Sequence, residues 1–525
     1  MRRPGSLGLA ALIVLVLASA VLLQPFGYNQ GAHLALVKAL AHGTPRIDAY
    51  ATYSGDVASY HGHLYSNKAP GLAFATLPAY LVLHALGLPS GVHALALWSV
   101  LLPALGLLLL VRWVADRLEP GLGTAAAAIL GAGTLLLPFT GLFFAHALSA
   151  FLGFAAFAVL WREREGPGRL ALVAGAGALA GFAVTTEYPL VIAAVVLAGY
   201  AAARRGRLRR LLAYGAGLAA GLAPLLLYQL WAFGTVLRST YSGQVVHTGG
   251  TGPGIVKETQ PDGLGGRAHV AVELLFSYRG LLTLAPVVTT SAVALVLLYR
   301  RGKRAEAGAI AALAVLLLAA NGGAWGAFGG WGPGPRYLIT ALPFLAVPLV
   351  LALRARPATT VALALVSIGA MTVATATVPL LPNNMGRVGR QGDVAHTGVW
   401  FDRLRDGDFT RTVLSSAGAG HGWVAIAPFL LLVVVALGLA AAATTWPRVR
   451  PRDLVGAAVA LAGWALCVHF LPRLLHDDYG ARGLGAGGAI VAVAAGVGVT
   501  IAAIYAGGAS TSTSERPAVA SSSKT

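Results

Sequence analysis

The chain's densest group of chemically capable side chains lies between residues 45 and 71. Two separate carboxylates, Asp48 and Asp56, are followed by the run Tyr60-His61-Gly62-His63-Leu64-Tyr65-Ser66-Asn67-Lys68-Ala69-Pro70-Gly71. A carboxylate can take a proton from a hydroxyl, and a lysine can stabilise the negative charge of a departing phosphate. These residue types are suited to a group transfer in which Asp56 is the general base, Asp48 a supporting residue and Lys68 a phosphate ligand.

Spacing alone leaves a structural alternative open for each of these residues. Asp56 could cap the turn that follows it, and Lys68 could extend to lipid headgroups; such roles are common for isolated loop residues. On a strand, His61 and His63 would share a face and could bind a divalent metal with Asp56. Because two histidines without a third defined ligand usually only form hydrogen bonds, we predict neither a protein-held metal nor a cofactor, and metal dependence stays open.

The composition predicts the elements that must position this loop. Of 525 residues, 57% are hydrophobic and 11% charged, and the mean hydropathy is +0.73, far above that of a soluble domain. Roughly fourteen apolar stretches of span length can be drawn. The net charge of +19 comes from short basic clusters between apolar runs, which points to lipid headgroups rather than nucleic acid. A single cysteine, Cys467, excludes a disulfide framework. We predict an all-α polytopic membrane protein.

Five basic clusters set the orientation, because positive loops stay on the cytoplasmic side. They fall on one side only if residues 71–87 form a juxtamembrane or re-entrant helix and 92–111 form the second span. This arrangement predicts a multi-pass protein of the plasma (inner) membrane with cytoplasmic N- and C-termini and outer loops at 27–90, 234–280 and 381–423. The clusters are Arg2-Arg3, Arg204 to Arg210, Arg300 to Arg304, Arg354/Arg356 and Arg448 to Arg452.

Other ionisable residues lie at the predicted outer ends of spans. Arg279 and Arg336 could each bind a phosphate through a guanidinium, or could simply anchor a helix end. Positive-inside bias favours a function for Arg336, since an outer arginine needs a partner. His146 and Glu187 could line the same cavity, because ionisable groups near the hydrocarbon are costly; satisfaction by backbone or headgroups is an equal alternative. Lys257 is a weaker candidate in a glycine-rich loop.

Several segments together resemble the GT-C superfamily of polytopic glycosyltransferases, in particular the bacterial branch related to protein O-mannosyltransferases and aminoarabinose transferases. The most specific is the run from Tyr60 to Gly71. The others are Phe143 to Leu148, Thr186-Glu187-Tyr188, Tyr278-Arg279-Gly280-Leu281 with Pro286, and Gly329-Gly330-Trp331-Gly332-Pro333-Gly334-Pro335-Arg336-Tyr337-Leu338. Together they span most of residues 27–353.

The resemblance implies a GT-C-like helix bundle with outer juxtamembrane helices, and an inverting transfer of a hexosyl or pentosyl group from a polyprenyl-phosphate donor. The acceptor hydroxyl would belong to a glycan, lipid or protein. An outer-loop aspartate would be the base. The resemblance therefore favours a catalytic role for Asp56 over the role of a turn cap. Because the chain lacks the superfamily's adjacent Asp-Glu pair, the choice between Asp48 and Asp56 stays open. Predicted substrate-binding residues are Tyr60, His61, His63, Tyr65, His146, Glu187 and Tyr337.

Two rival functions share the membrane topology. A transporter or flippase of lipid-linked glycans would place polar groups near the bilayer midplane on broken helices, whereas this chain gathers them in outer loops. A glycan polymerase or ligase would differ in its donor. We predict three regions: a catalytic transmembrane module at 1–354 that includes the loop 27–90, additional helices at 355–507 with the outer loop 381–423, and a disordered cytoplasmic tail at 508–525.

Overall fold

The computed structural model describes residues 4–475, apart from positions 24, 243, 246–262, 278, 325, 331, 378, 381–399 and 401–402. Several predicted features lie outside the described residues: Arg2-Arg3, Lys257, Tyr278, Trp331, about half of the loop 381–423, residues 476–507 of the C-terminal region and the tail 508–525.

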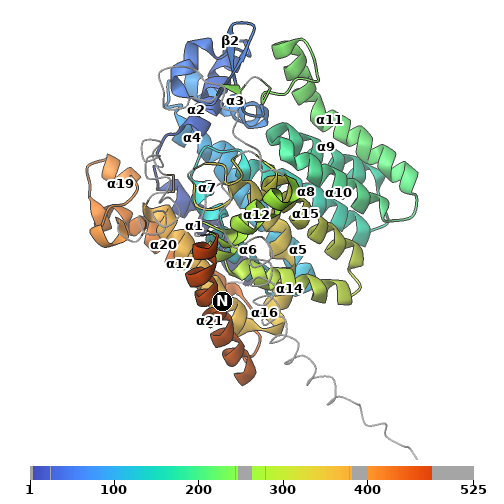
Figure 1. Cartoon of the computed structure of the whole chain (residues 1–525), viewed down its shortest axis with the longest axis vertical. Helices are drawn as coiled ribbons and strands as arrows, with labels where there is room; N and C mark the ends of the chain where they lie inside the picture. Colours follow the sequence, from blue (N-terminus) through green and yellow to red (C-terminus); the bar gives the residue numbers. More distant parts are fainter. Residues whose placement is uncertain are drawn as a thin grey trace, which may run out of the picture.

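Nearly all described elements are helices (Figure 1). The first half of the chain forms α1 (Pro4–Ala20), α2 (Tyr28–Ala41), η1 (Asp48–Tyr53), α3 (Gly71–Ala85), α4 (Val92–Ala96), η2 (Leu97–Leu101), α5 (Leu102–Leu118), α6 (Gly123–Ala132), α7 (Leu136–Thr140), α8 (His146–Glu165), α9 (Leu170–Thr186), η3 (Tyr188–Leu190), α10 (Val191–Ala202) and α11 (Arg207–Phe233). The second half forms α12 (Gly263–Phe276), α13 (Leu281–Leu284), α14 (Val287–Arg300), α15 (Arg304–Gly322), η4 (Arg336–Ala341), α16 (Leu342–Ala355), α17 (Pro357–Thr377), α19 (Val413–Ser416), α20 (Gly422–Ala443) and α21 (Pro451–Leu474).

Within the described residues, seven helices are long and apolar enough to cross a membrane, and the bent unit of α12, α13 and α14 would be an eighth. Five further apolar helices are shorter. The prediction of an all-α polytopic membrane protein is confirmed, although the described residues hold seven or eight candidate spans, against roughly fourteen apolar stretches drawn over the whole sequence. Helix α3 has 15 residues, about 22 Å of length, and is too short for a bilayer of about 30 Å, whereas Val92–Leu118 is a full span, as predicted.

Small residues let α9 and α11 pack at close range. A Cβ added to Gly217 of α11 would lie 1.8 Å from the Ala174 carbonyl oxygen, and one added to Gly177 of α9 would lie 2.1 Å from the Tyr214 carbonyl oxygen. Any side chain at these positions would separate the two helices. The glycine-rich runs of this region are therefore packing surfaces.

The loop that carries the sequence motif folds into a small antiparallel sheet. Strands β1 (Val57–Tyr60) and β2 (His63–Ser66) form a hairpin, and the short β3 (Gln244–Val245) pairs with the other edge of β1. The turn residues His61 and Gly62 both have positive φ, +49° and +78°, as a two-residue type I′ turn requires. Much of the predicted signature is thus a hairpin, and Gly62 is needed for its turn.

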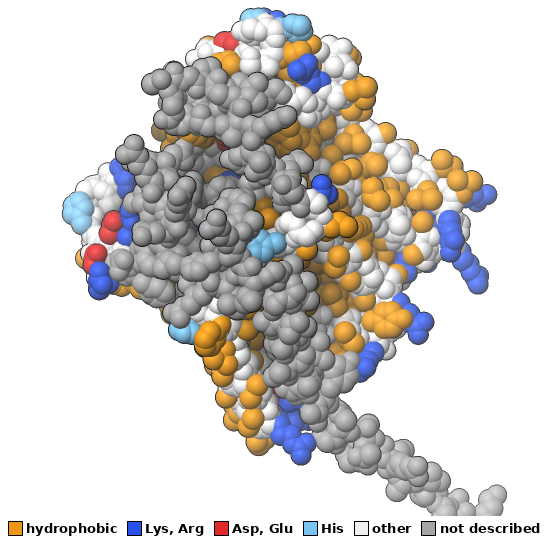
Figure 2. Space-filling view, viewed as in Figure 1, with side chains coloured by type: hydrophobic (Ala, Val, Ile, Leu, Met, Phe, Trp, Pro, Cys, Tyr) orange, Lys and Arg blue, Asp and Glu red, His pale blue; other side chains and the backbone are white. Residues whose placement is uncertain are grey.

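Three of the basic clusters, those around Arg210, Arg301 and Arg354, lie at one end of the bundle, here called the basic end. Arg301 and Arg354 both contact Glu119, at 2.5 and 3.7 Å, and Glu163 near the end of α8 binds Arg210. Lys and Arg side chains gather along the lower right border of Figure 2. Helix α8 begins at His146 and has 20 residues, so its two ends are about 30 Å apart, the thickness of a bilayer core.

The C-terminal helices join the same bundle. Helix α20 packs along α1, and α17 packs against α16, α14 and α6 (Figure 1). The division between 354 and 355 remains a prediction.

Candidate functional site

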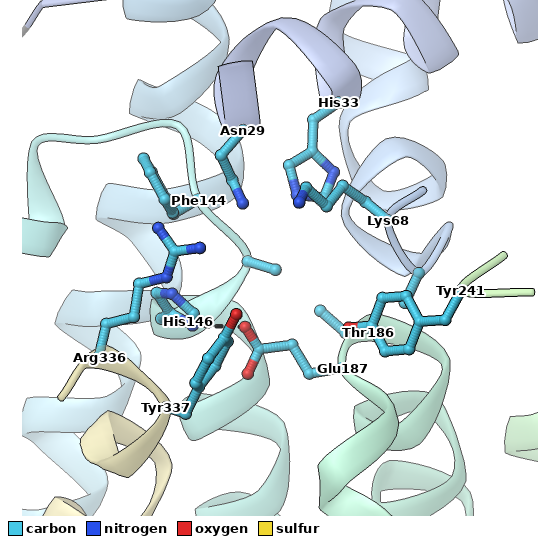
Figure 3. A pocket seen from close by; sticks show the side chains of 12 residues that line it. Asn29, His33, Lys68, Phe144, His146, Thr186, Glu187, Tyr241, Arg336 and Tyr337 are labelled. Carbon is cyan, nitrogen blue, oxygen red and sulfur yellow. Dashed lines mark ion pairs between the residues drawn. The ribbon is translucent and has the colours of Figure 1, made fainter. Parts of the chain in front are cut away.

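A cavity lies among the N-termini of α2 and α8, the C-terminus of α9 and the start of η4 (Figure 3). It is therefore at the end of α8 opposite the basic end. The lining residues come from segments far apart in the sequence: Asn29, His33, Lys68, Ala69, Phe144, Ala145, His146, Thr186, Glu187, Tyr241, Arg336 and Tyr337. Of the predicted site residues, Lys68, His146, Glu187, Arg336 and Tyr337 meet here.

Lys68 reaches the cavity from the end of the hairpin. Its Nζ lies 2.8 Å from Asp56 Oδ2, and both side chains are largely shielded from solvent. The register explains why they are near: Val57 pairs with Ser66, the Asn67 N–H donates to the Asp56 carbonyl at 3.3 Å, and Lys68 is the next residue. The predicted base and the predicted phosphate ligand are thus in direct contact with each other.

Helix α2 contributes two residues that the sequence analysis missed. Asn29 and His33 are four positions apart and share one helix face toward the cavity (Figure 3). His33 is 2% exposed, and its Nδ1 has no hydrogen-bond partner within the described part of the chain. Burial lowers the pKa of His33 well below its usual range, and the charges of Lys68, His146 and Arg336 lower it further. The i, i+4 spacing of Asn29 and His33 was the only signal for them in the sequence.

His146 and Glu187 form a buried ion pair on the opposite wall. His146 Nδ1 contacts a Glu187 carboxylate oxygen, and the Ser149 hydroxyl donates to the other oxygen at 3.0 Å. His146 opens α8 and Glu187 follows α9, so helix termini hold both residues. The sequence grouped these two residues in one cavity, and the structure brings them together.

Arg336 enters the cavity from the start of η4. Its guanidinium lies 5.1 Å from the centre of the Phe144 ring and 5.4 Å from that of Tyr337. A Cβ at Gly329 would lie 2.4 Å from Arg336 Nε, so this glycine, with a φ of +77°, makes room for the arginine. The cation is thus held by aromatic faces, and its N–H groups remain directed toward the cavity.

Arg279 does not line the cavity, although it was grouped with Lys68 and Arg336. It is 4% exposed, lies over the Phe328 ring at 4.3 Å, and donates to the Gly330 carbonyl at 3.0 Å. These contacts support the glycine-rich segment that leads to Arg336.

The predicted sugar-binding residues of the hairpin also lie outside the cavity lining. Tyr65 is buried against Phe233, with ring centres 5.0 Å apart, and the Tyr60 hydroxyl donates to the Phe233 carbonyl at 3.2 Å. Both tyrosines attach the hairpin to the end of α11. His61 occupies the turn, where it cannot share a strand face with His63.

Asp48 is engaged by the hairpin rather than by the cavity. His63 Nδ1 lies 3.0 Å from Asp48 Oδ2, and the Leu64 N–H donates to Asp48 Oδ1 at 2.7 Å. The two side chains are 39% and 45% exposed. In the described ranges, no group of three or more His, Cys, Asp or Glu residues is arranged to hold a metal ion.

Several buried polar atoms of the cavity lining have unused hydrogen-bonding capacity. Within the described residues, His33 Nδ1, His146 Nε2, Arg336 Nε and Asn29 Oδ1 have no hydrogen-bond partner. Unmet buried polar groups cost free energy, so their convergence on one cavity is typical of a binding site for a polar ligand. Among the lining residues, the two cations Lys68 and Arg336 outnumber the one carboxylate, Glu187, which favours an anionic ligand.

No protein-family model and no curated protein matches the chain. Among solved structures, it is similar to ArnT from Cupriavidus metallidurans bound to undecaprenyl phosphate, at 15% identity and a TM-score of 0.44, over 94% of this chain and 75% of that one. It is also similar to the Archaeoglobus fulgidus oligosaccharyltransferase AglB in complex with an inhibitory peptide and a dolichol-phosphate, at 13% identity and a TM-score of 0.43, over 91% and 61%.

Proposed function

We propose that the protein is a membrane glycosyltransferase that moves a sugar from a polyprenyl-phosphate donor to an acceptor hydroxyl at the outer face of the plasma membrane. The observation that carries the proposal is the convergence of Lys68 and Arg336 in the cavity at the end of the bundle opposite the basic end. Two cations at an end of the helix bundle suit a lipid phosphate, because the headgroup would lie at the membrane surface while its tail lies in the bilayer.

The cavity offers complementary groups for such a donor. Arg336 presents planar N–H donors, which match phosphate oxygens, and Lys68 presents a compact charge. Both would stabilise the negative charge that grows on the phosphate as the sugar leaves. Glu187, held by His146 and Ser149, can accept hydrogen bonds from sugar hydroxyls, and Tyr337 and Tyr241 add aromatic surface.

Asp56 is the proposed general base. Its carboxylate lies beside Lys68, so it is at the edge of the proposed phosphate site, and it keeps access to solvent, from which an acceptor would come. The donor's charge would compete with Asp56 for the Lys68 ammonium and release the carboxylate toward the acceptor. Attack from the face opposite the phosphate would invert the anomeric centre. Asp48 would support the loop through His63 and Leu64.

The rival functions receive less support from this geometry. A transporter or flippase would need polar groups near the middle of the spans, whereas the cavity lies where α2, α8, α9 and η4 begin or end. A glycan polymerase or ligase would use the same groups with a different donor. A transfer assay with both kinds of donor distinguishes it from the proposed enzyme.

The test is a transfer assay with the purified full chain. We would incubate it with a panel of polyprenyl-phosphate sugars and polyprenyl-diphosphate glycans, and measure the released lipid phosphate. Release from a monophosphate-linked sugar is expected. Arg336→Ala and Lys68→Ala should each reduce turnover by about 10² to 10³, in line with the loss of one charge-stabilising donor.

Arg205→Ala, at the exposed basic end, is the matched control and should retain turnover. Normal turnover in both cavity variants would contradict the phosphate site. Release from diphosphate-linked glycans alone would favour a polymerase or ligase.

A further inference from the structure

The face of α2 that carries Asn29 and His33 has no assigned role in the transfer. It lies across the cavity from the His146–Glu187 pair, beside Lys68 (Figure 3). His33 is only 2% exposed. Within the described residues, neither its Nδ1 nor Asn29 Oδ1 has a hydrogen-bond partner. These two neutral groups therefore border the position that the cations Lys68 and Arg336 leave for an anion.

We propose that His33 is a phosphate-binding residue and that it takes up one proton when a lipid phosphate occupies the cavity. This inference rests on the proposed function, because it assumes that the anion is the donor or product phosphate. His33 would be the third phosphate-binding residue of the cavity. It differs from Lys68 and Arg336 because it is uncharged until the lipid phosphate binds.

The electrostatic surroundings explain why the charge of His33 would depend on the ligand. The groups that face it are Lys68 with its partner Asp56, His146 with its partner Glu187, Arg336, and the rings of Tyr241 and Tyr337. Burial and the neighbouring cations lower the pKa of His33 well below its usual range. An anion between them would offset the cations and raise this pKa, since a nearby opposite charge favours the charged form.

The reaction supplies a reason for such a group. As the acceptor oxygen bonds to the anomeric carbon, the bond from that carbon to the phosphate oxygen breaks, and its electron pair stays on the phosphate. A singly charged phosphodiester thereby becomes a doubly charged monoester, while the acceptor proton goes to the base. If His33 takes a proton from solvent, its neutral imidazole becomes a charged imidazolium. This cation can donate a hydrogen bond to the phosphate and stabilise its second negative charge.

The sign of the pH dependence follows by linkage. If ligand binding takes up a proton, the affinity must fall as pH rises through the pKa of His33 in the complex. The full effect of one proton is about tenfold per pH unit between the free and the bound pKa. A ligand that does not itself titrate is needed to see this effect.

We would measure binding of the methyl diester of a ten-carbon isoprenyl phosphate to the full chain in detergent, from pH 5.5 to 8.5. Wild-type affinity should fall by about tenfold or more across this range, and calorimetry in two buffers of different ionisation enthalpy should detect proton uptake. His33→Gln should bind the diester with a flat pH profile and without proton uptake.

Two further variants make the result decisive. His84→Gln, on α3 and outside the cavity lining, should keep the wild-type profile. His146→Gln tests the other imidazole of the cavity. A slope that persists in His33→Gln but disappears in His146→Gln would overturn the inference and assign the proton to His146.

Failure of the inference can be told from failure of the proposed function. Wild-type binding of the diester with no pH slope would reject the role of His33 and leave the phosphate site intact. No binding of the diester or of the parent monoester would reject both. If His33→Gln does not fold, as judged by its thermal unfolding, His33→Asn replaces it in the same titration.

Discussion

At the basic end, Glu163 is fully buried, and each of its carboxylate oxygens accepts a hydrogen bond from Arg210 at 2.6 Å. At the cavity end, Arg336 rests on aromatic rings, and its Nε has no hydrogen-bond partner in the part of the chain that the structure describes. The arginine at the basic end is therefore saturated by a carboxylate within the protein, whereas Arg336 at the cavity end keeps unused hydrogen-bonding capacity.

The difference separates structural from functional charge. A buried ion pair with saturated hydrogen bonds fixes the helices that carry it and has nothing left for a ligand. Unsatisfied groups persist in a folded protein at a cost in stability, and they are typical of sites where a ligand completes the hydrogen bonding. Composition cannot distinguish these two uses of arginine.

The largest expected effect concerns which end faces outward. In a Cys467→Ala background, a cysteine at the exposed Ser59 of β1 should react almost completely with a membrane-impermeant maleimide added to intact cells. A cysteine at the exposed Arg205 should react only after the membrane is permeabilised. Reaction at position 205 in intact cells would reverse the assignment of the two ends.

The second effect concerns the base at the cavity end. Asp56→Asn should lower single-turnover transfer by about 10² to 10⁴, because a base is removed while the hairpin is kept. Donor binding should change much less. Asp406→Asn, in an exposed segment, is the control and should be active. Near-normal transfer by Asp56→Asn would exclude it as the base.

The third effect concerns stability at the basic end. Glu163→Gln should lower the free energy of unfolding by about 3 to 5 kcal/mol, because the buried Arg210 charge loses its counter-ion. Thermal unfolding of the solubilised protein measures this loss, and the surviving folded fraction should keep its specific turnover. A loss of turnover without a loss of stability would mean that the basic end also takes part in function.

The smallest effect is expected at Asp48. Asp48→Asn keeps an oxygen that can accept from the Leu64 N–H and loses only an exposed contact with His63, worth about 0.2 to 1 kcal/mol. Turnover should fall by less than about tenfold. If Asp48→Asn were inactive and Asp56→Asn active, Asp48 would be the base and Asp56 the supporting residue.

The sequence by itself determined the membrane class, the shortness of the helix 71–85, and five residues of the cavity lining. Hydropathy and helix length are local properties, so a run of apolar residues reveals a span without knowledge of its neighbours. Lys68 stood out as the cation of the polar run from Tyr60 to Gly71, and Arg336 because an arginine at an outer helix end needs a partner.

Only the tertiary structure decided how these residues are combined. The hairpin brings Asp56 into contact with Lys68, and Arg279 donates to the glycine-rich segment before Arg336. His33 was not singled out in the sequence, and it gains a possible role only because α2, α8 and η4 line one cavity. Such contacts depend on the packing of segments hundreds of residues apart, and burial, which decides whether a polar atom needs a ligand, exists only after that packing is complete.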